Sequence, residues 1–141
     1  MKKLTFVFLA VILFGISGCK RSDVQPAVAG CAKNTAMVGM KDTYLSILCG
    51  CDEPAGTIKT ANQPLTCTVP VNSYVVFDFS GTTLFHQVIA VGTPAMPASP
   101  VRNPSASNPI ASYAFQPTLA GSTYGFQDRF ETQLTGQIVT R

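Results

Sequence analysis

Residues 71–79 alternate in side-chain character, and this alternation constrains the fold more than any other feature of the sequence. One face of the segment carries Val71, Ser73, Val75, Phe77 and Phe79, and the other carries the residues between them. A period of two residues is typical of a β-strand with one buried face, and β-branched and aromatic residues favour strands. The segment is therefore predicted to be a strand that covers a hydrophobic core.

Shorter segments of the same kind occur along the rest of the chain. Strands are predicted over residues 36–40, 43–48, 65–69, 84–91, 113–118, 122–127 and 136–141, although 43–48 fits one helical turn after Asp42 equally well. Residues 92–112 contain five prolines, which cannot donate a hydrogen-bond ladder, so a long surface loop is predicted there. Many short strands at this spacing indicate an all-β sandwich or barrel.

The composition limits the number of domains and the kinds of partner. A chain of 141 residues has room for one folded domain. Only 12% of the residues are charged and the net charge is +3. A nucleic-acid-binding surface of the usual kind needs clustered Lys and Arg, so no nucleic-acid partner is expected.

The first residues have the pattern of a bacterial lipoprotein signal. A short basic start precedes an apolar run over residues 4–16, too short for a transmembrane helix of about 20 residues but suited to a signal peptide. The run ends in Ser-Gly-Cys, which resembles a lipobox. We therefore expect residues 1–18 to be a signal peptide, Cys19 to carry lipid and residues 19–30 to form a polar tether. Lys20 after the cysteine favours the outer membrane. The alternative is an ordinary secretory signal with an incidental cysteine.

Four cysteines follow Cys19, and export would place them in an oxidising compartment. An even number of cysteines in a small exported domain indicates disulfides. A bond between Cys49 and Cys51 would be strained. The open pairings are Cys31–Cys49 with Cys51–Cys67, or Cys31–Cys51 with Cys49–Cys67. A thiolate site for Cu(I) or Zn, built on Cys49 and Cys51, is the alternative.

Two segments in the second half of the chain resemble the cupredoxin family. The strand over 71–79 leads through a turn to the sequence FHQV, whose His86 matches the His-x-Val that supplies the first copper ligand in that family. The sequences GSTYGF from residue 121 and GQI from residue 136 match the framework around the family's short ligand loop. The resemblance covers residues 65–141, with the proline-rich loop as an insertion. It implies a Greek-key β-sandwich over residues 31–141.

The copper ligands of the family are mostly replaced. Asp128 stands where the cysteine would be, Glu131 where the second histidine would be and Leu134 where the methionine would be, and His86 is the only histidine. A type 1 copper site needs a thiolate, two imidazoles and a weak axial ligand. No cysteine follows Cys67, so type 1 copper electron transfer is not expected.

Three interpretations of the altered site remain open. His86, Asp128 and Glu131 are expected to meet at one pole of the sandwich, because the resembled fold brings the histidine strand and the final loop together. In the first interpretation the site is vestigial, with a histidine bonded to backbone or water and solvated acids. In the second, these three residues hold Zn²⁺, Mn²⁺ or type 2 Cu²⁺, completed by water, Gln127 or Gln133. In the third, the two carboxylates act as an acid–base pair.

The sequence thus predicts a membrane-anchored lipoprotein of the cell envelope. We expect it to act as a non-enzymatic binding or structural module without a resident cofactor, and to meet a protein or small ligand at the loop over residues 92–112. The alternative is a metal-binding protein that uses His86, Asp128 and Glu131 at the altered copper site.

Overall fold

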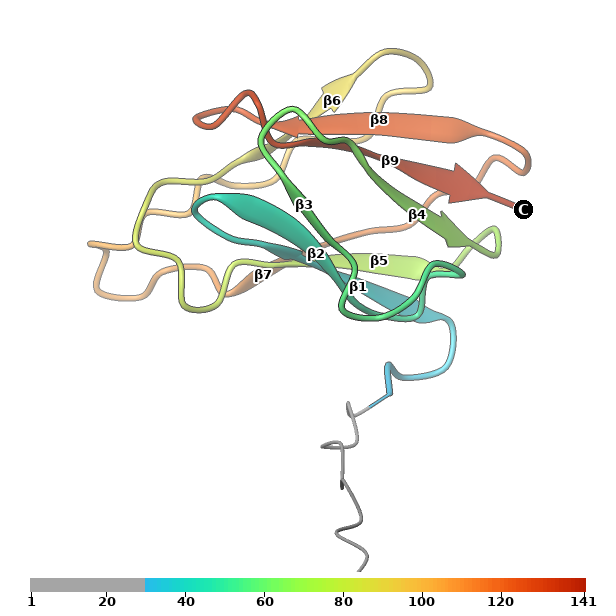
Figure 1. The fold of residues 1–141 in the computed structure, drawn as a ribbon, viewed down its shortest axis with the longest axis horizontal. Coiled ribbons are helices and arrows are strands. Elements are labelled where there is room, and N and C mark those ends of the chain that lie inside the picture. The colour runs from blue at the N-terminus through green and yellow to red at the C-terminus, as the bar shows by residue number, and fades with distance from the viewer. Residues whose placement is uncertain (1–29) are drawn as a thin grey trace, which may run out of the picture.

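The computed structural model describes residues 30–141, which form two β-sheets packed on each other (Figure 1). Sheet A has the order β3-β2-β1-β5-β7 and sheet B the order β4-β9-β8-β6. The strands of sheet A are β1 (Thr35–Met40), β2 (Tyr44–Cys49), β3 (Ile58–Thr60), β5 (Tyr74–Asp78) and β7 (Ser112–Phe115). Those of sheet B are β4 (Leu65–Val69), β6 (Val88–Val91), β8 (Thr123–Asp128) and β9 (Thr135–Thr140). The predicted all-β sandwich is confirmed.

Two strand pairs are parallel and set the connectivity of the sandwich. β1 pairs in parallel with β5, and β4 pairs in parallel with β9. Parallel neighbours need a connection that crosses from one end of the sheet to the other, so segments distant in sequence lie side by side. Within residues 30–141, no helix is long and apolar enough to cross a membrane.

The core between the sheets consists of alternate strand residues. Ser73, Val75, Phe77 and Phe79 are buried, which confirms the buried face predicted for residues 71–79. Phe77 packs edge-on against Phe126 of β8, with the ring centroids 4.9 Å apart. This contact joins an interior strand of sheet A to an interior strand of sheet B.

Several strand boundaries differ from the prediction. The strand predicted over 71–79 begins only at Tyr74, because residues 70–73 form a turn in which Asn72 has a φ of 65°. The strand predicted over 84–91 is reduced to β6, and His86 pairs only with Arg102 in an isolated bridge. The segment 43–48 is strand rather than helical turn, and the short β3 was not anticipated. Between β6 and β7, the predicted proline-rich loop contains no strand.

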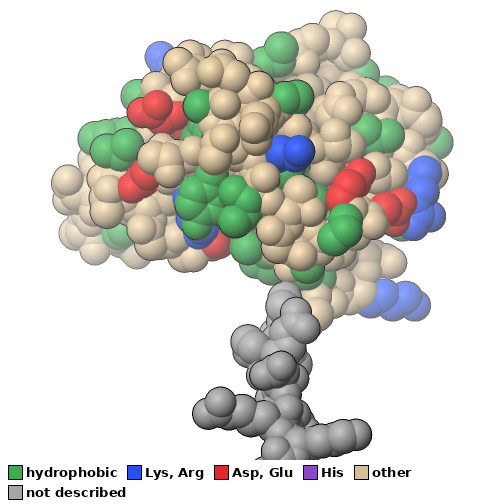
Figure 2. Space-filling model, viewed as in Figure 1, with side chains coloured by type: hydrophobic (Ala, Val, Ile, Leu, Met, Phe, Trp, Pro, Cys, Tyr) green, Lys and Arg blue, Asp and Glu red, His purple; other side chains and the backbone are tan. Residues whose placement is uncertain are grey.

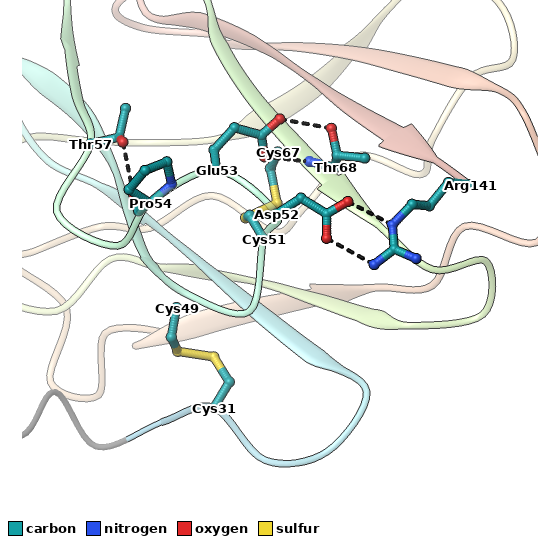
Figure 3. The surroundings of a disulfide bond; sticks show 10 residues. All are labelled: Cys31, Cys49, Cys51, Asp52, Glu53, Pro54, Thr57, Cys67, Thr68 and Arg141. Atoms are coloured by element: carbon teal, nitrogen blue, oxygen red, sulfur yellow. Dashed lines mark hydrogen bonds and ion pairs between the residues drawn. A yellow bond between two sulfur atoms is a disulfide. The ribbon is translucent and has the colours of Figure 1, made fainter.

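The two disulfides adopt the first of the two predicted pairings (Figure 3). Cys31 bonds Cys49 at the end of β2, and Cys51 bonds Cys67 within β4. The second bond therefore links the connection between β2 and β3 of sheet A to β4 of sheet B. All four sulfurs are consumed, which corrects the alternative of a thiolate metal site on Cys49 and Cys51.

Charged side chains are few on the surface, and some of them form ion pairs. Most of the face in Figure 2 consists of uncharged polar side chains and backbone, with single acidic and basic residues scattered over it. One exposed pair joins Arg141 to Asp52, with Nε 2.6 Å from Oδ2. The sparse charge agrees with the low charged fraction of the sequence.

Candidate functional site at His86

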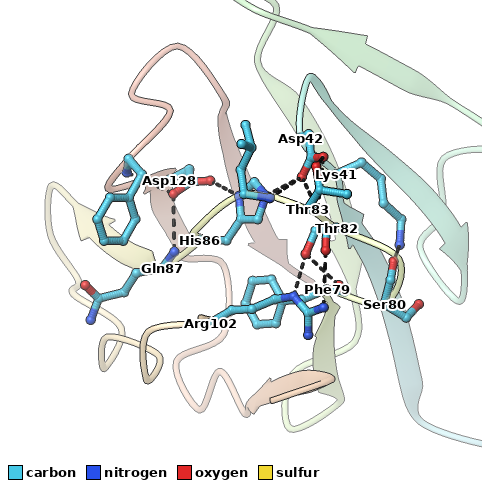
Figure 4. Close-up of polar contacts among 12 residues, drawn as sticks. Lys41, Asp42, Phe79, Ser80, Thr82, Thr83, His86, Gln87, Arg102 and Asp128 are labelled. Atoms are coloured by element: carbon cyan, nitrogen blue, oxygen red, sulfur yellow. Dashed lines mark hydrogen bonds and ion pairs between the residues drawn. The ribbon is translucent and has the colours of Figure 1, made fainter. Parts of the chain in front are cut away.

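His86 is fully buried, and carboxylates occupy both of its ring nitrogens (Figure 4). Nδ1 forms a short hydrogen bond with Oδ2 of Asp128, and Nε2 lies 3.0 Å from Oδ1 of Asp42. The ring also stacks on Phe79, with the centroids 6.4 Å apart. We call Asp42, His86 and Asp128 the histidine bridge, because they join three separate segments of the chain.

Asp128 ends β8 and is the buried end of the histidine bridge. Its side chain is fully excluded from water. Besides His86, its carboxylate accepts from the backbone N–H groups of Gln87, at 3.2 Å, and Phe130, at 3.0 Å. The two oxygens therefore have partners within the protein, as a buried carboxylate requires.

Asp42 lies in the turn between β1 and β2 and forms the outer end of the histidine bridge. Its side chain is 26% exposed. The carboxylate accepts from the N–H and hydroxyl of Thr83, at 3.0 and 2.6 Å, and from the N–H of Leu84 at 3.2 Å. Asp42 thus fixes the segment that leads into His86, which explains why this segment leaves the sheet.

The environment of the imidazole favours its charged form. Burial lowers the pKa of His86, but hydrogen bonds and charge from Asp128 and Asp42 outweigh burial and hold that pKa above its ordinary value. Burial raises the pKa of Asp42, yet hydrogen bonds from Thr83, His86 and Leu84 hold it well below its usual range. Carboxyl groups at both ring nitrogens therefore favour the protonated form of the imidazole.

Arg102 supports the same pole from the proline-rich loop. Its guanidinium is buried and donates to the hydroxyl and the carbonyl of Thr82 and to the carbonyl of Ile110. Its backbone exchanges hydrogen bonds with His86, at 2.8 and 3.2 Å. The loop is thereby tied to the strand connection that carries His86.

The structure brings together only part of the predicted site. His86 and Asp128 meet as expected, whereas the Glu131 side chain is exposed and no hydrogen bond or ion pair within residues 30–141 links it to either of them. Leu134 is buried, Gln133 is exposed and Gln127 is half-buried in β8. Among the described residues, no group of three or more His, Cys, Asp or Glu side chains is placed to hold a metal ion. A metal held by His86, Asp128 and Glu131 stays a prediction.

The vestigial interpretation needs correction in two details. Asp128 is not a solvated loop residue but a buried one, and His86 bonds carboxylates rather than backbone or water. Asp42 and Arg102 were missed by sequence reasoning. Asp42 lies more than 40 residues from Thr83, Leu84 and His86, and no local sequence pattern indicates either residue.

Comparison with known proteins identifies the fold. No protein family and no curated protein matches the sequence. Among solved structures, a methionine-to-alanine mutant of amicyanin with Cu(I) matches at a TM-score of 0.51 and 17% identity, covering 82% of this chain and 90% of that one. At this identity the likeness shows the fold alone, and the predicted cupredoxin-like sandwich is confirmed.

Proposed function

We propose that this protein is a lipid-anchored lipoprotein of the cell envelope whose cupredoxin-like domain binds a partner without catalysis and without type 1 copper. One observation carries the proposal. The only histidine of the chain has both ring nitrogens engaged by carboxylates, so neither nitrogen is free to bind a metal unless the histidine bridge opens.

The other residues around His86 do not fit type 1 copper either. Such a site requires a thiolate and a second imidazole. Cys31, Cys49, Cys51 and Cys67 are all in disulfides. A carboxylate with three hydrogen-bond donors, Asp128, stands at the position of the thiolate. The histidine bridge occupies this pole as a structural cross-link.

A catalytic role for the two predicted acids has little support. Asp128 is fully buried and Glu131 is exposed, so the two carboxylates differ in environment and do not contact each other. A fully buried carboxylate is less well placed to exchange a proton with a substrate than one that lines an open cleft. This favours a binding module over an enzyme.

The anchor rests on the amino-terminal sequence. The basic start, the apolar run over residues 4–16 and the Ser-Gly-Cys19 ending support lipidation of Cys19, and Lys20 supports the outer membrane. These residues lie outside the part of the chain that the structure describes. The domain would then be held close to the membrane by the tether over residues 19–30.

A copper titration tests the absence of a type 1 site. The mature protein is mixed with Cu²⁺ and its visible spectrum is recorded beside that of a type 1 copper protein. We expect no intense blue absorption, because no thiolate reaches the metal. A strong blue band would contradict the proposal. Elemental analysis after exposure to Zn²⁺ and Mn²⁺ tests the alternative of a different metal.

Cell fractionation tests the anchor. The Cys19→Ala variant should move from the membrane fraction to the soluble fraction, because it has no thiol to acylate. The matched control, Ser17→Ala, keeps a small residue before Cys19 and should remain in the membrane. Separation of the two membranes by density then tests the outer-membrane assignment. If the Cys19→Ala variant stays bound, the anchor is misassigned.

A further inference from the structure

β7 is an end strand of sheet A with an unused edge. Within its sheet it pairs only with β5. The hydrogen bond from the N–H of Phe79 to the carbonyl of Ala111 fixes which backbone groups of β7 point toward β5. Since bonded and non-bonded pairs alternate in an antiparallel ladder, the backbone groups of Ala114 and Gln116 point away from β5. Nothing else within residues 30–141 hydrogen-bonds the N–H or carbonyl of Ala114, which is exposed.

This edge opens into a hollow of about 470 Å³. One wall is β7, with Ala114 and Gln116, and the other is the proline-rich loop, with Pro94 and Pro97. Tyr124, at the start of β8, lies at its end. None of the residues that line the hollow is charged. The hollow lies at the opposite end of β8 from Asp128, and therefore away from the histidine bridge.

The wall formed by the loop with Pro94 and Pro97 is held in position by hydrogen bonds and does not pair with β7 as a strand. The hydroxyl of Tyr113 donates to the carbonyl of Pro97 at 2.7 Å and spaces the loop from β7. Proline has no N–H, so Pro94 and Pro97 cannot themselves extend the ladder of β7. The loop is fixed further along, where Ser99 donates its N–H to the carbonyl of Val88 at 2.9 Å. The groove is thus formed before anything binds.

We propose that the groove between β7 and Pro94–Pro97 binds an extended, uncharged peptide segment of a partner protein as an added strand of sheet A. This deepens the proposed function as a binding module and rests on it. A row of outward N–H and carbonyl groups matches the main chain of a strand. The uncharged lining favours an uncharged segment, because a charge buried there would lose its hydration without a counter-charge.

The geometry favours one added chain over a second copy of this protein. A second copy of this protein could pair with β7 only through the edge of its own folded sheet. Pro94 and Pro97 line the same hollow as Ala114, and a single extended chain needs less of that space than a second folded sheet edge. The occupant is therefore a segment that is extended and unpaired before it binds.

Selection from a displayed library of short random peptides tests the proposal on the mature protein. The strongest peptide is synthesised, and its affinity is measured by fluorescence anisotropy. We expect uncharged, β-branched sequences to be enriched. Methylation of every second backbone nitrogen should weaken binding by up to about tenfold per lost hydrogen bond, while methylation of the nitrogens between should not.

A pair of proline variants locates the binding edge. Ala114→Pro removes the outward N–H of β7 and should weaken binding by up to about tenfold. Ile58→Pro is the matched control, because Ile58 lies exposed on β3 at the opposite edge of the same sheet. It should leave the affinity unchanged. Circular dichroism checks that both variants fold, and if Ala114→Pro does not, the methylation series on the unaltered protein decides.

Three results would overturn the inference. The first is that the library yields no peptide that binds. The second is that the affinity of the selected peptide is unchanged by methylation at every backbone nitrogen. The third is that the protein self-associates through Ala114 and that this association excludes the peptide. The last result would assign the edge to a second copy of the chain. None of them changes the copper titration or the fractionation, so a failure here is distinct from a failure of the proposed function.

Discussion

His86 and Asp128 form a fully buried hydrogen-bonded pair that joins the β5–β6 connection to the end of β8. In the cupredoxin pattern the second of these positions carries the thiolate ligand, so a metal ion would make the same connection there. Here the imidazole and the carboxyl group of Asp128 make it directly through a hydrogen bond.

Removal of the imidazole should strongly destabilise the fold. His86→Ala leaves Asp128 buried without its charged partner, and loss of one partner of a buried pair costs about 3–5 kcal/mol. Urea unfolding of the variant and of the unaltered protein measures the difference in the free energy of unfolding. Glu131→Ala is the control, since loss of an exposed acid should change it by less than about 0.5 kcal/mol. A cost below about 1 kcal/mol for His86→Ala would contradict a structural role for the bridge.

Stability should pass through a maximum in mildly acidic solution. The raised pKa of His86 means that its contribution is complete below the ordinary value of about 6.5 and is lost as the pH rises through the raised value. The lowered pKa of Asp42 means that its contribution is complete above about 3.9 and is lost as the pH falls. Melting temperatures measured from below the ordinary pKa of Asp42 to above the raised pKa of His86 test both slopes. In His86→Gln the decline on the alkaline side should disappear, and an unchanged decline would show that another group causes it.

The two disulfides should contribute differently to stability. They span 18 and 16 residues, so the loop-closure model gives each about 3 kcal/mol. Cys67 is fully buried, and its truncation also leaves a cavity. The double variant Cys51→Ala, Cys67→Ala should therefore be less stable in urea than Cys31→Ala, Cys49→Ala. The reverse order would mean that packing at Cys67 is unimportant.

Replacement of Arg102 should loosen the proline-rich loop. Arg102→Met keeps much of the side-chain volume but removes the hydrogen bonds to Thr82 and Ile110, at a cost of about 1–3 kcal/mol. Hydrogen exchange should become faster over residues 92–111 and stay unchanged in β9. As a control, Arg129→Met removes an exposed guanidinium and should not alter exchange in the loop. Equal exchange in both variants would contradict this role of Arg102.

The fold could be predicted further than the site. The strand around Val75 and Phe77 could be predicted from its own residues, because the two-residue period and the residue types both indicate a strand. The start of β6 at Val88 rather than at Leu84 did not follow from the residues of the segment, since the N–H of Leu84 bonds Asp42 from another part of the chain. The pairing of Asp128 with His86 followed from the family resemblance. Asp42 as the second partner had no such guide.

All four cysteines of the sandwich lie in its first half, between residues 31 and 67. If the chain is exported amino-terminus first, both native disulfides can form while residues 68–141 are still crossing the membrane. Cys67 belongs to β4, whose only partner within its sheet is β9, the last strand to emerge. The Cys51–Cys67 bond can therefore hold β4 against the first sheet until β9 arrives. The bond would thus keep β4 in position during translocation, and it would later stabilise the finished domain.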